Sequence, residues 1–171
     1  MKKHLALVMI GLLALCSCRT VAVSTNYKPT QEESMSIQKT YAFIKEVGHY
    51  FIASVQGDQP RVRPFGTIHI FEDKLYIQTG RSKKVAQQLL TNGKAEICAL
   101  NMKANSWIRV SGELVEDPRR EAKASLLDEY ASLKNMGYSP DDPNTLVLYF
   151  KPGTVTATIY SFTADPVEMK F

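Results

Sequence analysis

The sequence predicts a mainly β domain, built as a small closed barrel of antiparallel strands with a few peripheral helices. Three observations lead to this prediction. Seven segments have the composition and alternation of strands, the connections within strand pairs are short turns, and only three segments show helical spacing. Short turns join antiparallel neighbours, whereas parallel strands need long crossovers, so a parallel layered sheet is disfavoured.

The composition suits one globular domain. The chain has 171 residues, of which 44% are hydrophobic and 22% are charged. Its formal net charge is +4, and half of that comes from Lys2 and Lys3 at the extreme N-terminus. The remaining charge is too small for a nucleic-acid-binding surface, and we expect no nucleic-acid partner.

The N-terminus reads as an export signal. A short basic region, Met1–His4, precedes the uncharged apolar run Leu5–Leu15, which has the length of a secretion signal and is too short to span a bilayer comfortably. Leu15 lies three residues before Cys18, and the small Ser17 lies directly before it. This arrangement resembles a bacterial lipobox.

We therefore expect residues 1–17 to be a lipoprotein signal peptide and Cys18 to carry the lipid. Residues 18–31 would form a tether to a domain spanning residues 32–171. The protein would be exported to the bacterial cell envelope and held at a membrane by its lipid alone. An ordinary cleaved signal peptide is the alternative. In either case only Cys98 remains, and we expect it to be a small core residue without a disulfide.

The first half of the domain is expected to begin with a helix over Glu32–Val47, where Ile37, Tyr41 and Ile44 recur at helical spacing and Gly48 ends it. Three strands follow, joined by tight turns as an antiparallel meander. Their expected ranges are Tyr50–Val55, Arg61–Phe71 and Leu75–Thr79.

The second helix is expected to be capped by Ser82 and to run to about Leu90. Two strands follow, Lys94–Asn101 and Ser106–Glu116, and the second alternates so that Trp107 and Arg109 lie opposite Ile108 and Val110. Asp117 and Pro118 are expected to start the third helix as N-cap and first-turn proline. The last two strands are Thr145–Phe150 and Thr154–Phe162.

The main chemical signal lies between Pro60 and Leu90. Arg61 and Arg63 alternate onto one face of a strand, and Arg81, Lys83 and Lys84 lie at the start of a helix. Basic side chains and free N–H groups at a helix start suit an anion, most often a phosphate. The sequence therefore predicts a phosphorylated ligand.

Four ordered motifs carry a family resemblance, namely R-V-R-P-F-G-T-I, L-Y-I-Q-T-G-x-x-K-K-V, A-E-I-C-A-L and W-I-R-V-S-G-E-L. Together they resemble the small single-domain members of the pyridoxamine 5′-phosphate oxidase-like family, over roughly residues 37–162. The resemblance implies a split β-barrel, antiparallel and Greek-key-like, with peripheral helices. It also implies a homodimer with FMN in two clefts at the interface.

The resemblance further implies which residues bind FMN. Arg63 and Lys84 would hold the phosphate, with Thr79, Arg81 and Ser82 in the same loop. The backbone of Val62, Pro64 and Phe65 would lie along the flavin ring, Gln88 would reach the cofactor or face solvent, and Trp107 of a partner subunit would flank the ring.

Each assignment has a simpler alternative. Lys83 is expected to face solvent, and one of the two strand arginines would pair with a carboxylate such as Glu72 or Glu113. Trp107 would instead fill a core or an interface. The two histidines of the domain, His49 and His69, lack metal-ligand spacing and are expected to be structural.

The resemblance thus implies an FMN-dependent oxidoreductase that exchanges electrons between a small donor and a small acceptor, with no catalytic side chain assigned. Nitroimidazole reductases fall within this class. A non-enzymatic flavin- or haem-binding or sensing lipoprotein is the alternative, and an empty barrel acting as an interaction module is a third possibility.

Overall fold

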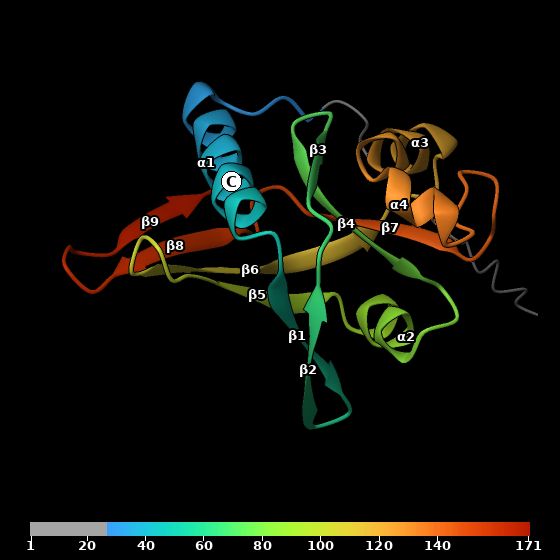
Figure 1. The fold of residues 1–171 in the computed structure, drawn as a ribbon, viewed down its shortest axis with the longest axis horizontal. Coiled ribbons are helices and arrows are strands. Elements are labelled where there is room, and N and C mark those ends of the chain that lie inside the picture. The colour runs from blue at the N-terminus through green and yellow to red at the C-terminus, as the bar shows by residue number, and fades with distance from the viewer. Residues whose placement is uncertain (1–26) are drawn as a thin grey trace, which may run out of the picture.

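A computed structural model describes residues 27–171 (Figure 1). The expected signal peptide, the lipidated Cys18 and most of the tether lie outside these residues. The elements are α1 (Gln31–Val47), β1 (Tyr50–Gln56), β2 (Gln59–Phe65), β3 (His69–Phe71), β4 (Lys74–Gly80), α2 (Lys84–Thr91), β5 (Lys94–Asn101), β6 (Ser106–Glu116), α3 (Arg120–Glu129), α4 (Ala131–Asn135), β7 (Thr145–Phe150), β8 (Thr156–Ser161) and β9 (Val167–Lys170).

All strand pairings are antiparallel, and the main path through the sheet runs β2-β1-β5-β6-β7-β4-β3. β2 and β3 therefore lie at its two ends, although only Gly66–Ile68 separate them in the chain. This short link brings the two edges together without pairing them, which gives a barrel that is open along one seam. The split β-barrel that the family resemblance implies is confirmed, whereas the closed barrel expected from the short turns is wrong, because β2 and β3 do not pair.

The expected strand Arg61–Phe71 is wrong as a single element. It divides at Gly66–Ile68 into β2, which pairs with β1, and β3, which pairs with β4. The three-stranded meander is therefore wrong as well. Both parts have strand-like composition, so the break follows from tertiary pairing and has no strong local signal.

β6 joins the two halves of the barrel. Along one edge it pairs first with β8, over Ser106–Ser111, and then with β7, over Leu114–Glu116. Gly112 lies at the change of partner, where an added Cβ would come 3.0 Å from Phe150. A side chain at this position would have to push that ring aside, so the close approach favours glycine.

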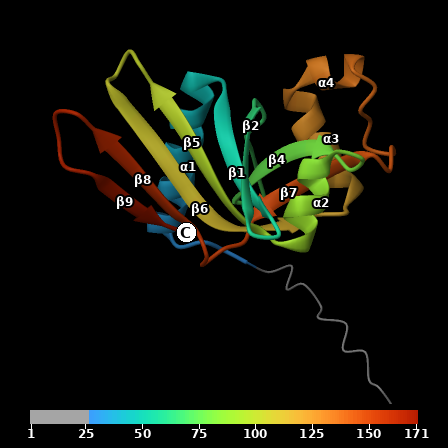
Figure 2. The ribbon, with the colours of Figure 1, turned by 90° about the horizontal axis from the view of Figure 1, so that it is seen from below.

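The main core lies inside the barrel, covered by α1. Ile37 and Ile44 of α1 pack with buried side chains such as Ile52, Ile97 and Ile108 of the strands. A capping box between Thr30 and Glu33 starts this helix, and Gly48, with a φ of 80°, ends it. Figure 2 shows α1 lying along one side of the β5, β6 and β8 strands.

A second, smaller core lies under α3. Ala122 and Leu126 of that helix pack on Tyr76, Val147 and Tyr149. Both faces of β7 are consequently buried, one by each core. The helical segment α3–α4 is thereby fixed against β3 and β7, at the end of the barrel away from β8 and β9 (Figure 1).

Two expected helix caps are wrong. Ser82 does not cap α2, because the N-cap is Lys83 and the N–H of Ser82 donates to Asn144 Oδ1 at 2.9 Å. Asp117 does not cap α3, whose N-cap is Arg119. Instead the buried Asp117 carboxylate accepts hydrogen bonds from Tyr76 and Arg119.

Cys98 was expected in the core and is exposed. The strand alternation of β5 directs Ile97 and Ala99 inward and therefore places Cys98 on the outer face. The C-terminal strand β9, which pairs with β8, was not predicted. No helix among residues 27–171 is both long and apolar enough to cross a membrane.

Candidate functional site

The arginines of the described segment divide into two groups. Four of them form ion pairs with carboxylates: Arg81 with Glu116, Arg109 with Glu96, Arg119 with Glu72 and Asp117, and Arg120 with Asp141. Within residues 27–171, Arg61 and Arg63 of β2 have no carboxylate within ion-pair distance. The expected pairing of one of them with Glu72 or Glu113 is wrong, since Glu72 binds Arg119 and Glu113 binds Lys151.

Arg61 and Arg63 bond to neutral groups instead. The guanidinium of Arg63 donates to Ser54 Oγ at 2.7 Å and to Gln88 Oε1 at 2.6 Å. Arg61 Nε donates to Gln56 Oε1 at 3.2 Å. Partial burial, followed by the charge of Arg61, lowers the pKa of Arg63. Two uncompensated cations side by side favour a bound anion, which would relieve their repulsion.

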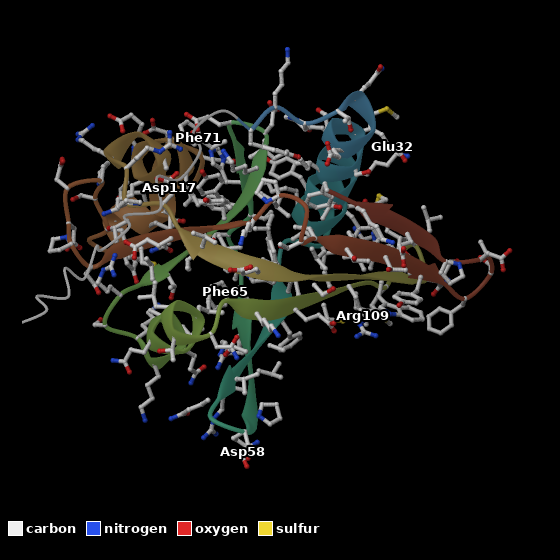
Figure 3. The ribbon with its side chains drawn as sticks, turned by 180° about the vertical axis from the view of Figure 1, so that it is seen from behind. Glu32, Asp58, Phe65, Phe71, Arg109 and Asp117 are labelled. Atoms are coloured by element: carbon white, nitrogen blue, oxygen red, sulfur yellow. The ribbon has the colours of Figure 1, made fainter. Side chains whose placement is uncertain are left out.

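Arg63 faces a cleft of about 410 Å³ beside the seam between β2 and β3. Of the residues predicted to bind a cofactor, the cleft contains Arg63, Pro64, Phe65 and Thr79. Its other lining residues are His49, Gly66, Thr67, Gln78, Lys83, Val85, Tyr130, Ser132 and Leu133. Figure 3 shows Phe65 near the base of the β1–β2 hairpin, whose tip carries Asp58.

The cleft is lined by cationic and polar side chains on the one hand and by apolar side chains on the other. Arg63 and Lys83 supply two cationic donors, and Thr79 supplies a hydroxyl. Phe65, Val85 and Leu133 supply apolar surface from three different elements. Such a combination suits a ligand with an anionic group at one end and a flat apolar part at the other.

The remaining predicted residues lie outside this cleft. Lys84 and Gln88 line a neighbouring hollow of about 230 Å³. Arg81 is engaged by Glu116 and by the carbonyl oxygen of Pro143, at 3.2 Å, and its backbone N–H donates to Asn144. These bonds fasten the turn before α2 onto the loop before β7.

Trp107 and Val62 lie on the outer face of the sheet, as the predicted alternation of β6 requires for Trp107. The indole of Trp107 stacks on Tyr160 with 4.9 Å between ring centroids and 9° between planes. Val62 is 64% exposed. Neither residue lines the cleft of its own chain, so a cofactor contact from Trp107 would have to come from another subunit.

Tyr130 closes the back of the cleft. Its hydroxyl accepts from the N–H of Ile68 at 2.9 Å and donates to the carbonyl of Ile68 at 2.8 Å, and Lys45 Nζ lies 3.2 Å away. The α3–α4 segment is thus attached to the link between β2 and β3. Sequence reasoning missed Tyr130, because nothing in the local sequence indicates a hydrogen bond to the distant backbone of Ile68.

Behind Tyr130, a polar network joins α1, β3 and α3. Glu129 accepts from Lys45 Nζ at 2.5 Å, from Tyr41 at 2.7 Å and from His69 Nδ1, while His69 Nε2 lies 2.8 Å from Ser125 Oγ. The order Ser125–His69–Glu129 is that of a hydrolase triad. However, Ser125 lies beyond the first turn of α3, where helical N–H groups are hydrogen-bonded within the helix and cannot stabilise an oxyanion.

The network is therefore a structural support for the cleft wall. Burial raises the pKa of Glu129, but the hydrogen bonds from Lys45, His69 and Tyr41 outweigh burial, and the pKa lies below its ordinary value. Among residues 27–171, no three His, Cys, Asp or Glu side chains are grouped as metal ligands. His49, by contrast, is exposed at the cleft.

The fold defines an antiparallel split β-barrel protein, with a cationic cleft beside its open seam. The family model for pyridoxamine 5′-phosphate oxidase matches residues 37–159, and the chain belongs to this family. The resemblance drawn from the four sequence motifs is confirmed. No curated protein matches the chain.

Solved structures agree with this assignment. A nimC/nimA family protein from Clostridium acetobutylicum is 41% identical, with a TM-score of 0.76, and the match covers 81% of this chain and 94% of that chain. A pyridoxamine 5′-phosphate oxidase-related, FMN binding protein from Nostoc punctiforme is 17% identical, with a TM-score of 0.57 and coverages of 80% and 95%. A heme binding protein from Mycobacterium smegmatis is 13% identical, with a TM-score of 0.59 and coverages of 85% and 60%. The last two likenesses show the fold alone.

Proposed function

We propose that the protein binds FMN and acts as a flavin-dependent oxidoreductase on a small molecule. The observation that carries this proposal is the cleft, where Arg63 has no carboxylate partner in the described chain and lies with Lys83 and Thr79. Membership of the pyridoxamine 5′-phosphate oxidase family and the printed name of the Nostoc punctiforme protein support FMN as the ligand.

The lining residues fit FMN by their chemistry. Arg63 and Lys83 would hold the phosphate, because a phosphate dianion prefers charge-assisted donors and both side chains provide them. Phe65, Val85 and Leu133 would bind the ring by apolar contact and keep water from its faces. When bound, the flavin supplies hydride and electron transfer between a reduced donor and an acceptor.

We further propose a homodimer that forms through the outer face of the sheet. This face carries large exposed apolar side chains, including Phe51, Leu100 and Val62, together with the stacked pair of Trp107 and Tyr160. An apolar surface of this kind on a sheet is suited to burial against a second copy. In such a dimer, Trp107 of one subunit would flank the flavin of the other, as the family resemblance implies.

The export signal is also a proposal. The lipobox-like sequence before Cys18 supports an exported lipoprotein, anchored to a membrane only by its acyl chains. The redox reaction would then take place at a membrane surface of the bacterial cell envelope.

The visible spectrum of the purified protein tests the proposed function. We expect flavin bands, or their appearance after addition of FMN, and anaerobic bleaching when a reduced nicotinamide nucleotide is added. Nitroimidazoles are the acceptors to try first, because the class that the family resemblance implies includes nitroimidazole reductases. Failure to take up FMN would contradict the proposal.

Haem binding is a second candidate. The Mycobacterium smegmatis neighbour is named as a heme binding protein, and His49 offers an exposed imidazole at the cleft, whereas His69 is held by Glu129 and Ser125. A Soret band that disappears in a His49→Ala variant would favour haem over flavin.

A further inference from the structure

Gln88 of α2 makes an unusual set of contacts for a glutamine on a surface helix. Its side chain is buried, with 7% of the residue exposed, and its amide oxygen accepts from Arg63 at 2.6 Å and from Ser54 Oγ at 2.8 Å. The orientation of the amide is fixed by chemistry, because a guanidinium only donates and must therefore face the oxygen.

The amide nitrogen of Gln88 continues the same chain of bonds. Nε2 donates to Gln56 Oε1 at 3.3 Å, and Gln56 Oε1 also accepts from Arg61. Two neutral amides thus connect two arginines. At every other arginine of the described segment the corresponding partner is a carboxylate, as in the pairs Arg109–Glu96 and Arg120–Asp141.

The difference between an amide and a carboxylate determines what Arg63 can do. Either group can accept the hydrogen bond that fixes the guanidinium, but a carboxylate would also neutralise its charge. The bonds to Ser54, Gln88 and Ile52 occupy three of the five N–H groups of an arginine. Two donors and the full positive charge remain for a ligand in the cleft.

We propose that Gln88 is a positioning residue that makes the site selective for a phosphorylated flavin over an unphosphorylated one. This inference rests on the FMN site proposed above. Gln88 holds the Arg63 guanidinium at the cleft without neutralising its charge. The phosphate of the ligand is then the anion that neutralises this charge. It acts through Arg63 and does not itself touch the ligand.

The test compares FMN with riboflavin, which has the same ring and lacks the phosphate. Dissociation constants are measured for both ligands with the full-length protein and with Gln88→Glu, which has almost the same shape and adds one negative charge. We expect FMN binding to weaken at least tenfold and riboflavin binding to change less than twofold. Gln87→Glu, which adds the same charge to an exposed neighbour on α2, should change FMN binding less than threefold.

A second variant keeps the inference testable if Gln88→Glu fails to fold. Gln88→Leu removes the acceptor without adding charge, and we expect a smaller loss, about threefold to tenfold, again restricted to FMN. If both variants lost affinity equally for FMN and for riboflavin, Gln88 would only support the packing of the site, and the inference would be overturned. If the unchanged protein binds neither ligand, the proposed function itself fails, which is a separate and distinguishable result.

Discussion

Lys83 and Arg63 line the same cleft, whereas Lys84, the next residue in the chain, lies at the neighbouring hollow with Gln88. The helix start explains the separation. Lys83 is the N-cap, with an extended backbone at φ −75° and ψ 146°, and Lys84 is the first helical residue. The two side chains therefore leave the backbone in different directions.

This placement changes which lysine we expect to bind phosphate. The family resemblance assigned that role to Lys84 and left Lys83 in solvent, but the shared cleft favours Lys83. We expect Lys83→Ala to raise the dissociation constant for FMN about five- to thirtyfold, equivalent to about 1–2 kcal/mol for one charge-assisted hydrogen bond. Lys84→Ala should have a smaller effect. Fluorescence titration with FMN measures both, and a larger effect at Lys84 would place the phosphate in the hollow.

The sequence predicted the strands that pair with their neighbours in a regular way. The bounds of β5, β6 and β7 agree with the expected ranges, because each alternates or is predominantly apolar and ends at a turn. The division of β2 from β3 was missed, since both halves of Arg61–Phe71 favour extended structure. Only the pairing of each half with a different strand separates them.

The candidate site could be predicted from the sequence only in part. The positive charge at Arg61 and Arg63 was visible in the sequence, because alternation places both on one face of a strand. The absence of a carboxylate partner in the described chain was not visible, since Glu72 and Glu113 were equally plausible until Arg119 and Lys151 were found to bind them. Contacts between residues far apart in sequence decide such pairings.

The lipid anchor is tested at Cys18. We expect Cys18→Ser to move the protein from the membrane fraction to the soluble fraction, because the acyl chains supply about 0.8 kcal/mol per buried CH₂ group and are lost together. Cys16→Ser is the matched control. This variant should remain in the membrane fraction, because residue 16 would be removed with the signal peptide and Cys18 could still carry the lipid. Fractionation followed by mass spectrometry of the N-terminal peptide distinguishes the two. Release by Cys16→Ser would show that the lipobox is misplaced.

Glu129 should stabilise the fold in a pH-dependent manner. Glu129→Gln weakens the bonds to Lys45, Tyr41 and His69, and we expect a loss of about 1–3 kcal/mol in the free energy of unfolding at pH 7. The pKa of Glu129 is lowered in the folded protein, so its contribution is complete above the ordinary value of 4.5 and disappears as the pH falls through the folded value.

Urea unfolding at pH 7 and near pH 3 measures this dependence. The difference between the unchanged protein and Glu129→Gln should shrink at the lower pH. Glu121→Gln, at an exposed position on the same helix, should cost less than about 0.5 kcal/mol. A difference that is independent of pH would contradict the role of the ionised carboxylate.

The outer face of the sheet is tested at Leu100, which is 50% exposed beside Trp107. We expect Leu100→Asp to convert a dimer to a monomer, because a buried, unpaired charge at an apolar interface is strongly unfavourable. Met136→Asp is the control, since Met136 is 70% exposed but lies after α4, away from that face. Sedimentation velocity measures the oligomeric state, and a monomeric unchanged protein would exclude this interface.

Trp107 reports on the same interface through its fluorescence, because it is the only tryptophan in the chain. It does not line the cleft of its own subunit, so direct contact with bound FMN requires the cleft of a partner, whereas energy transfer to the flavin also acts at longer range within one subunit. We expect FMN to quench Trp107 more strongly in the dimer than in Leu100→Asp at concentrations that saturate the flavin site. Equal quenching in monomer and dimer would mean that the partner's Trp107 does not contact the ring, and the proposed dimer arrangement would then be wrong.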